Sequence, residues 1–279
     1  MSIIGEGLTW IIKPAAAPPA VGLKLYCAAG DAFYNLGGLS TVNTETLDIE
    51  NFVNANHFCN YITSDETAFY VAGWTMIYKI VGNSVVDSVD TNDENIGSLD
   101  NDSQYVYAAG YTKIYKIDKS TMDIVGSITV GDEYTVEIKV LVVGDYLYAL
   151  LSKYDPNTNQ VKKVSLQTFQ VVGSCDLLTY ETTCLCSDGN FLYVGDEYDS
   201  YVEKISLSTF NVVDYCTLSQ SINDVLYDNG YVYALGDSKI FKIDASSMDV
   251  VGELQTNLFP GMFLAIGGGY LYAIGRITP

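Results

Sequence analysis

The sequence is short of the residues on which most site chemistry depends. Its 279 residues include one histidine, one arginine, two tryptophans and six prolines. A single imidazole and a single guanidinium argue against His-based catalytic triads and against an arginine cluster. The six cysteines do not complete a zinc pattern, because Cys184 and Cys186 have no second pair at knuckle spacing. We therefore expect no catalytic residue, no metal and no cofactor.

Basic residues are also scarce. The chain has 14 lysines and arginines against 34 aspartates and glutamates, which gives a net charge of −20. Nucleic acids are bound through clustered lysine and arginine, and anionic membranes attract basic segments, so the sequence predicts neither as a partner. The same charge is compatible with a surface that serves solubility alone, and this alternative stays open.

A continuous membrane span is missing as well. Residues 8–30 are fairly apolar, but lysines and prolines interrupt them, and the extreme N-terminus carries Glu6 instead of basic residues. These features differ from those of a signal peptide and of a transmembrane helix. We therefore expect a soluble protein, located inside the cell or in a virion.

The chain does contain a repeat. Residues 105–128 read YVYAAGYTKIYKIDKSTMDIVGSI, and looser copies of this stretch recur along the chain. A period of about 40 residues accommodates the four short strands of one propeller blade. Runs of Val, Ile and Tyr bounded by Gly, Asp, Asn and Ser favour strands over helical repeats. One tyrosine marks the same position in every copy, at intervals of 37 to 45 residues: Tyr26, Tyr70, Tyr107, Tyr148, Tyr193, Tyr233 and Tyr272.

Each copy predicts strands A to D, from the centre of a propeller outwards. Strand B is apolar at consecutive positions, which is typical of a sheet covered on both faces. We expect Cys184 and Cys186 to be buried as small apolar residues. The prediction is an all-β fold, a seven-bladed β-propeller with four-stranded antiparallel blades. Strand C carries a lysine at one repeat position, which we interpret as structural: Lys79, Lys116, Lys163, Lys204 and Lys242.

The repeat resembles the repeats of a known group of propellers. The motifs Tyr-Val-Tyr-Ala, Lys-Ile-Tyr-Lys-Ile-Asp and Asp-Ile-Val-Gly-Ser-Ile resemble the repeats of YVTN-type propellers, within the broader group similar to WD40 proteins. The resemblance covers nearly the whole chain, although neither Trp-Asp nor Tyr-Val-Thr-Asn occurs. It implies a binding scaffold without implying a ligand. The many Tyr, Asn, Thr and Ser residues and the few lysines also resemble proteins from viruses of thermophilic archaea.

The two ends of the chain complement each other. Residues 3–12 contain a strand that precedes the first full repeat, whereas the last repeat has strands A and B only. We expect residues 1–14 to supply the closing strand of the last blade, because closure removes exposed strand edges. The prediction is a single domain, residues 1–279, with a ring closed by the N-terminal strand.

The copies differ most in two B–C loops. From the strand B tyrosine to the strand C lysine the distance is 9 residues in three copies, but 15 after Tyr148 and 11 after Tyr193. Variable loops on a rigid scaffold are where binding usually resides. Together with the D–A loop between them, these loops predict an acidic, tyrosine-rich rim as the binding site: Tyr154, Asp155, Asn157, Asn159, Tyr180, Glu181, Asp196, Glu197, Tyr198 and Asp199.

The predicted function is that of a non-enzymatic scaffold for protein–protein interaction or assembly, as a structural or accessory protein of a virus or an archaeon. The acidic rim predicts a partner with a basic or cationic surface. The alternative is a carbohydrate-binding module, or a glycoside hydrolase with paired carboxylates, at the same rim. A closed pocket with carboxylates of raised pKa would favour the alternative, and an open rim would favour the scaffold.

Overall fold

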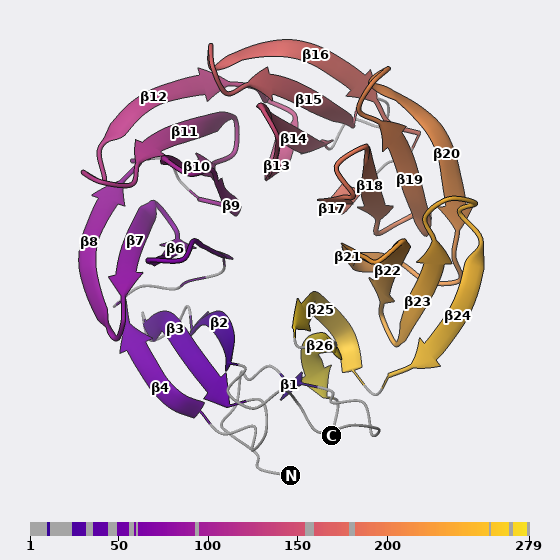
Figure 1. Cartoon of the computed structure of the whole chain (residues 1–279), viewed down its shortest axis with the longest axis horizontal. Coiled ribbons are helices and arrows are strands. Elements are labelled where there is room, and N and C mark those ends of the chain that lie inside the picture. Colours follow the sequence, from indigo (N-terminus) through magenta and orange to yellow (C-terminus); the bar gives the residue numbers. More distant parts are fainter. Residues whose placement is uncertain are drawn as a thin grey trace. The chain divides into compact units, whose positions relative to one another are not determined.

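Every regular element in the described part of the chain is a β-strand (Figure 1). Contacts divide the chain into two compact units. Unit 1 comprises Met1–Ala20, Pro156–Gln160 and Cys175–Pro279, and unit 2 comprises Val21–Asp155 and Val161–Ser174. The computed structural model describes residues 10–11, 24–31, 36–43, 49–55, 59, 61–92, 95–153, 159–178, 182–256, 258–267 and 270–277.

Among its described residues, unit 2 holds three four-stranded sheets and one three-stranded sheet, apart from Gln160, Cys175 and Asp176 at the ends of two strands, which belong to unit 1. The strands of each sheet lie in sequence order, as the repeat predicts. The three-stranded sheet is β2 (Lys24–Asp31), β3 (Leu36–Asn43) and β4 (Ile49–Asn54), which occupy the positions of strands B to D. The four-stranded sheets are β5 (Tyr61–Ser64), β6 (Phe69–Gly73), β7 (Met76–Val81) and β8 (Ser84–Asp90); β9 (Ser98–Asn101), β10 (Tyr105–Ala109), β11 (Lys113–Asp118) and β12 (Ile124–Thr129); and β13 (Thr135–Val143), β14 (Tyr146–Lys153), β15 (Gln160–Ser165) and β16 (Gln170–Asp176).

Unit 1 holds two four-stranded sheets and a three-stranded sheet in the ranges that the structure describes. The three-stranded sheet is β25 (Leu258–Gly267), β26 (Tyr270–Ile277) and β1 (Trp10–Ile11), with Trp10 opposite Gly275. The N-terminal strand therefore pairs with the last strand of the chain. The four-stranded sheets are β17 (Thr182–Ser187), β18 (Phe191–Asp196), β19 (Tyr201–Ser206) and β20 (Asn211–Thr217); and β21 (Ile222–Asp228), β22 (Tyr231–Gly236), β23 (Lys239–Asp244) and β24 (Val250–Gln255).

Strand B is buried on both faces, which explains its consecutive apolar residues. On β10, Val106 packs in a core cluster with Tyr70 and other residues of β6 and β7. The next residue, Tyr107, packs in another cluster with Leu147 and other residues of β13 and β14. Successive side chains of a strand point to opposite faces, so each sheet contributes to two cores. Cys184 behaves as predicted, because it lies in the core cluster around Tyr193.

The C–D turns contain a feature that the repeat pattern does not predict. A large apolar residue adopts a positive φ in four of them: Met122 (55°), Phe169 (51°), Phe210 (53°) and Met248 (58°). Each donates its backbone N–H to the carbonyl four residues earlier at 2.8 Å. The left-handed conformation costs an L-residue roughly 1–2 kcal/mol, and burial of Met122 and Met248 offsets that cost.

The strand C lysines connect neighbouring sheets. The ammonium of Lys79 donates to the carbonyl of Lys119 at 2.6 Å, and that of Lys204 donates to the carbonyl of Ala245 at 2.6 Å. Each acceptor lies in the C–D turn of the next sheet, three residues after that sheet's own repeat lysine. Lys204 also lies over the ring of Phe191, 4.3 Å from its centroid. These contacts agree with a structural role for the repeat lysines.

Candidate functional site

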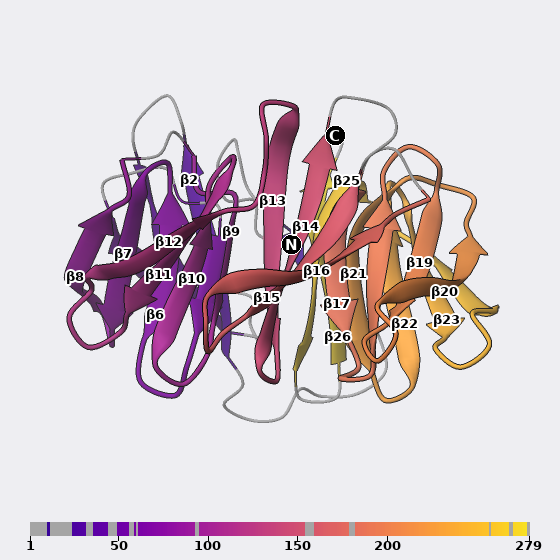
Figure 2. The ribbon, with the colours of Figure 1, turned by 90° about the horizontal axis from the view of Figure 1, so that it is seen from above.

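The turns lie at two opposite ends of each sheet (Figure 2). Neighbouring strands are antiparallel, so the B–C turns and the D–A connections lie at one end, here named the BC end. The A–B and C–D turns lie at the other end, the AB end. The BC end corresponds to the predicted rim.

Exposed aromatic side chains are concentrated at the BC end of both units. In unit 2 these are Trp74 and Tyr111 in B–C turns and Tyr134 in a D–A connection, and in unit 1 it is Tyr198 in a B–C turn. Among the described residues, the other strongly exposed aromatic is Tyr215, on the outer strand β20. Aromatic residues are enriched at interaction sites, so each of these exposed rings is available to a partner within its own unit.

The D–A connection before β13 is a turn held by Asp132. One carboxylate oxygen accepts from the N–H of Tyr134 at 3.2 Å and from the hydroxyl of Thr135 at 3.0 Å. The other oxygen pairs with the ammonium of Lys153 at 2.6 Å. The backbone is therefore fixed while the Tyr134 side chain, 51% exposed, and Glu133 face solvent.

The B–C turn after β18 is built in the same way. The carboxylate of Asp196 accepts the backbone N–H of Asp199, and the turn ends at Ser200 with a φ of 61°. Asp196 is 1% exposed, whereas Tyr198 is 75% exposed and Glu197 also faces solvent. A buried carboxylate thus positions an exposed tyrosine and an exposed glutamate.

Both turns have the same sequence, Gly-Asp-Glu-Tyr, at residues 131–134 and 195–198. The glycines are required by close packing. A Cβ on Gly195 would lie 2.6 Å from the Sγ of Cys184, and one on Gly131 would lie 2.9 Å from the Oγ1 of Thr135. Aligning the copies at equivalent repeat positions does not reveal this tetrapeptide. The two tetrapeptides occupy different connections, so only a search for identical short words would have found them.

The structure describes half of the predicted site residues. Glu197, Tyr198 and Asp199 lie in the B–C turn as expected, with Glu197 and Tyr198 exposed. Asn159 and Asp196 are 2% and 1% exposed, so their side chains are buried in the protein instead of facing a partner. Tyr154, Asp155, Asn157, Tyr180 and Glu181 lie outside the described residues.

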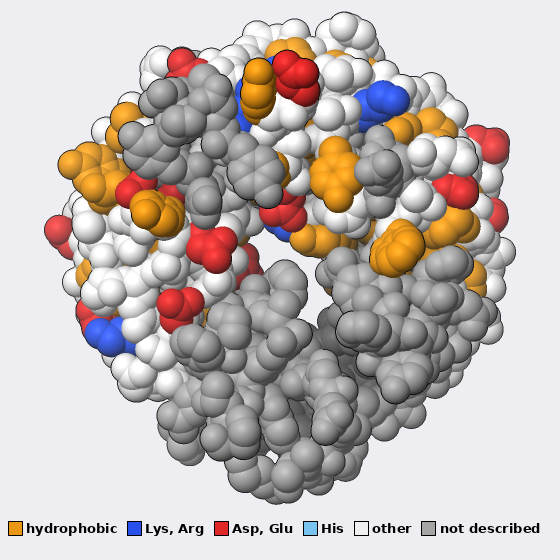
Figure 3. All heavy atoms as spheres, turned by 180° about the vertical axis from the view of Figure 1, so that it is seen from behind, with side chains coloured by type: hydrophobic (Ala, Val, Ile, Leu, Met, Phe, Trp, Pro, Cys, Tyr) orange, Lys and Arg blue, Asp and Glu red, His pale blue; other side chains and the backbone are white. Residues whose placement is uncertain are grey.

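Asp132, at the BC end of unit 2, is ionised at neutral pH. Hydrogen bonds from Lys153 and Thr135 hold the pKa of Asp132 below its usual range, although burial opposes them. In the view from behind, Figure 3 shows acidic side chains (red) and hydrophobic ones (orange) near one another over the described parts, where Lys and Arg (blue) are sparse. Such a surface favours a cationic partner.

Within the described ranges, neither a metal-binding cluster nor a membrane-spanning helix is present. Nowhere in them do three or more His, Cys, Asp or Glu side chains gather closely enough to hold a metal ion. In the same ranges no helix has the length and apolar character of a membrane span.

Comparison with known proteins identifies the fold. No family model and no curated protein matches the sequence. Among solved structures, 1223 chains match, and a fold shared so widely does not select a function. One of them is the crystal structure of BamB from Moraxella catarrhalis, at 14% identity and a TM-score of 0.60, over 86% of this chain and 81% of that chain. Together with the five four-stranded antiparallel sheets, this likeness shows that the chain has a β-propeller fold.

Proposed function

We propose that this protein is a non-enzymatic scaffold that binds a basic protein surface through the BC end of its sheets. The observation that carries the proposal is the pair of Gly-Asp-Glu-Tyr turns, each of which presents a tyrosine and a glutamate to solvent from a fixed backbone. Preorganised loops bind with less loss of conformational entropy, and tyrosine is enriched at binding hot spots. A role in protein interaction is also common among propellers of this kind.

The chemistry of the turns selects a cationic partner. Glu133 and Glu197 supply negative charge next to Tyr134 and Tyr198, whose rings can receive a lysine or arginine in a cation–π contact. The net charge of −20 extends the attraction to longer range and speeds association at low salt.

A catalytic role is less compatible with these carboxylates. A glycoside hydrolase needs one carboxylic acid of raised pKa beside a second carboxylate. The pKa of Asp132 is lowered, and Asp196 is engaged by its own turn. Burial raises the pKa of Asp100, but this residue lies on β9 and accepts from the backbone N–H of Val142 at 2.6 Å.

The scaffold that we propose is a closed ring of seven blades with repeats of the YVTN type. Seven copies of the strand B pattern and the pairing of β1 with β26 support this arrangement. Deletion of residues 1–12 would then expose an edge of β26 and open the ring. We expect a markedly lower Tm or aggregation, measured by thermal unfolding and light scattering. An unchanged Tm without aggregation would argue against closure.

Capture from an extract of the source cells tests the binding proposal. Immobilised wild-type protein, the double variant Tyr134→Ala/Tyr198→Ala and the control Tyr215→Ala are compared, and the captured proteins are identified by mass spectrometry. The control removes an exposed tyrosine from the outer strand, 53% exposed against 51% for Tyr134 and 75% for Tyr198. We expect a basic protein to be captured by wild type and by the control, and lost with the double variant.

The purified partner then allows a kinetic test. Glu133→Gln together with Glu197→Gln should slow association at low salt, and the difference should shrink as salt is raised. Asp196 stays unchanged because its carboxylate holds the turn. The proposal is contradicted by two results together. The double tyrosine variant captures the same protein, and the glutamine variant associates at the wild-type rate. The binding surface would then lie elsewhere.

A further inference from the structure

Unit 1 contains a pocket at the AB end of its sheets, opposite to the end that carries the turn at residues 195–198. It has a volume of about 400 Å³ and lies between the sheet β17–β20 and the sheet β21–β24. Its lining includes Asp188, Phe191, Lys204, Tyr227, Asp244 and Ala245. The lining thus combines two carboxylates, one ammonium group and aromatic rings.

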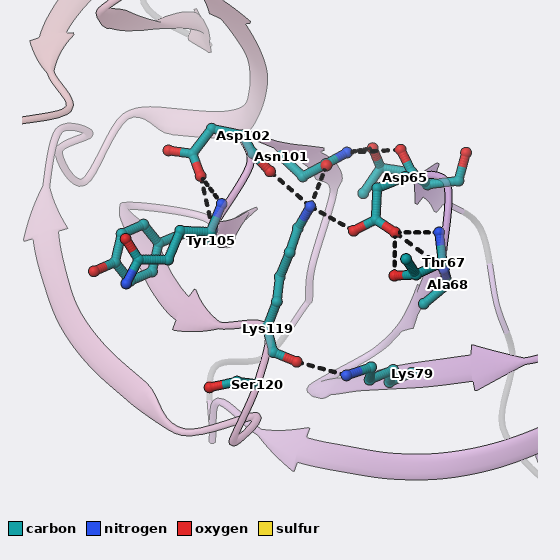
Figure 4. A network of polar contacts seen from close by, with 12 residues as sticks. Asp65, Thr67, Ala68, Lys79, Asn101, Asp102, Tyr105, Lys119 and Ser120 are labelled. Carbon is teal, nitrogen blue, oxygen red and sulfur yellow. Dashed lines mark hydrogen bonds and ion pairs between the residues drawn. The ribbon is translucent and has the colours of Figure 1, made fainter.

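The equivalent space in unit 2 is occupied by the side chain of Lys119 (Figure 4). Between the sheets β5–β8 and β9–β12, the Lys119 ammonium contacts the carboxylate of Asp65 at 2.7 Å, the amide oxygen of Asn101 at 2.6 Å and the carbonyl of Asp102 at 2.6 Å. All three partners lie in A–B turns or at their edges. A lysine side chain therefore joins the A–B turns of two neighbouring sheets.

The repeat aligns these two places residue by residue. Lys119 lies three positions after the strand C lysine Lys116, and Ala245 lies three positions after Lys242. The carbonyls of both residues accept the lysine of the preceding sheet, at 2.6 Å in each case. Ala245 thus takes the place of Lys119 with a side chain that lacks the ammonium group and most of its volume.

The surrounding carboxylates are conserved between the two places in position and in geometry. In unit 2, Asp65 accepts the backbone N–H groups of Thr67 and Ala68 at 2.8 and 3.0 Å. In unit 1, Asp188 accepts those of Asn190 and Phe191, both at 2.7 Å.

The second carboxylate is equally well matched. Asp118 and Asp244 accept from the N–H and the hydroxyl of Ser120 and Ser246, respectively, at 2.8 and 2.5 Å in both turns. Hydrogen bonds from these serines lower the pKa of both carboxyl groups, so both are ionised at neutral pH.

The charges show what the pocket lacks. In unit 2, the equivalent positions hold Asp65 and Asp118 together with Lys79 and Lys119, so their formal charges sum to zero. In unit 1, Asp188 and Asp244 face Lys204 alone, because Ala245 is neutral, so the lining keeps one net negative charge. A bound monocation would restore the balance found in unit 2.

Aromatic residues line the space where a cation would lie. Tyr227 occupies the repeat position of Asn101, and its ring is stacked on Tyr193 at 6.1 Å between centroids with an interplanar angle of 1°. Its hydroxyl accepts the N–H of Gly230 at 3.2 Å, which fixes the ring. A rigid aromatic face can stabilise a cation in place of the amide oxygen of Asn101.

We propose that this pocket binds one primary alkylammonium group, at the place that the Lys119 side chain fills in unit 2. The ammonium lies between the Asp188 carboxylate and the Tyr227 ring, and its alkyl chain fills the volume next to Ala245. The ligand is the side chain of a lysine on a partner protein or a free aliphatic amine. This site is separate from the proposed binding turns and does not depend on them.

The test uses n-butylammonium, which matches the lysine side chain, and the neutral analogue 1-butanol. Amide NMR spectra of the wild-type protein are recorded during titration with each compound. We expect saturable shifts at Phe191, Gly230 and Ser246 with butylammonium, with a Kd of about 1 mM for so small a ligand. Asp188→Asn should weaken binding by at least roughly tenfold. Equal shifts with 1-butanol, or none with either compound, would overturn the proposal.

Two substitutions of one residue provide a readout without added ligand. Ala245→Lys supplies the missing ammonium from the chain itself and should abolish butylammonium binding while raising Tm by roughly 2–4 °C. Ala245→Met fills a similar volume without charge and should leave Tm at or below that of wild type. A Tm that rises equally in both variants would show that the pocket is an unfilled volume with no preference for a cation.

The source of the amine follows from a second probe. Nα-acetyl-lysine methylamide carries the same ammonium group on a peptide unit. Binding tighter than that of butylammonium assigns the pocket to a lysine of a partner protein, and binding at least tenfold weaker assigns it to a free amine. Both results support an ammonium site. If neither probe binds, the proposal is contradicted.

Discussion

The AB and BC ends of the sheets use the same residue type for opposite purposes. At the AB end, Asp102 and Asp188 hold the A–B turns, and each also accepts the hydroxyl of a buried strand B tyrosine, at 2.7 Å from Tyr107 and 2.9 Å from Tyr193. At the BC end, Asp132 and Asp196 hold turns whose tyrosines face solvent. The aspartates fix the backbone in all four turns.

The difference between the ends lies in where the tyrosine is placed. At the AB end it is part of the core, and lysines connect one sheet to the next. At the BC end it is available to a partner. Substitutions at the AB end should therefore reduce stability, and substitutions of exposed residues at the BC end should reduce binding alone. The following predictions test this contrast, from the largest expected effect on stability to the smallest.

Lys119→Met should have the largest effect. It removes three hydrogen bonds and leaves Asp65 and Asn101 without their common donor in a partly buried place. We expect the free energy of unfolding to fall by about 2–3 kcal/mol, below the range for a fully buried pair because Asp65 is partly exposed. Urea unfolding measures the change.

The control for that substitution is Lys239→Met. Lys239 pairs with Glu253 at 2.7 Å on the surface, where an ion pair contributes less than about 1 kcal/mol. The double variant Lys119→Met/Asp65→Asn should recover part of the loss, because it removes the unpaired charge. Equal effects of Lys119→Met and Lys239→Met would contradict a structural role for the network.

Gly195→Ala tests the packing beneath the exposed turn. The added methyl group would meet the Sγ of Cys184 at 2.6 Å and the Cγ2 of Ile222 at 2.9 Å, which costs about 1–3 kcal/mol through overpacking. Gly252→Ala is the control, because its nearest contact is 3.7 Å and its cost stays within about 0.5 kcal/mol. Unfolding free energies that are equal for the two variants would show that the turn can shift without cost.

Acid should destabilise the protein partly through its turns. Burial raises the pKa of Asp65, but hydrogen bonds from Lys119 and Thr67 outweigh it and hold the pKa well below its ordinary value of 3.8. A lowered pKa in the folded state means that the contribution is complete above pH 3.8 and is lost as the pH falls toward the folded pKa. Unfolding free energies between about pH 5 and about pH 2 should therefore fall less steeply for Asp65→Asn than for wild type.

Tyr198→Ala should have the smallest effect on stability. Its side chain is 75% exposed, so the free energy of unfolding should change by no more than about 0.5 kcal/mol. The same holds for Tyr134→Ala. Circular dichroism melts check this expectation, and a clear loss of stability would show that the tyrosines contribute to the fold and are unsuitable as binding probes.

Much of the fold could be predicted because the repeat encodes it. The strand B tyrosines Tyr70, Tyr107, Tyr148 and Tyr193 are buried, and the strand order within sheets follows the predicted A to D sequence. The left-handed C–D turns were not predicted, because a methionine or phenylalanine at positive φ contradicts local preference. Burial in the tertiary structure stabilises Met122 and Met248 there.

The candidate site was predicted in part. Loop length identified the turn that contains Tyr198, because an insertion between two regular strands is visible in the sequence. Loop length could not reveal that Asp196 is buried. The sequence does not distinguish an aspartate whose carboxylate accepts a backbone N–H from one whose carboxylate faces solvent. The amine pocket was also not predicted, because it arises from the small size of Ala245 beside residues distant in sequence.

Hydrogen–deuterium exchange of the protein with and without its captured basic partner tests the central claim most directly. The contrast between the two ends predicts protection on binding at residues 131–135 and 196–200, with little change in the A–B turns at residues 102–105 and 188–191. Protection confined to those A–B turns, with residues 131–135 and 196–200 unchanged, would contradict the assignment of the BC end as the binding surface.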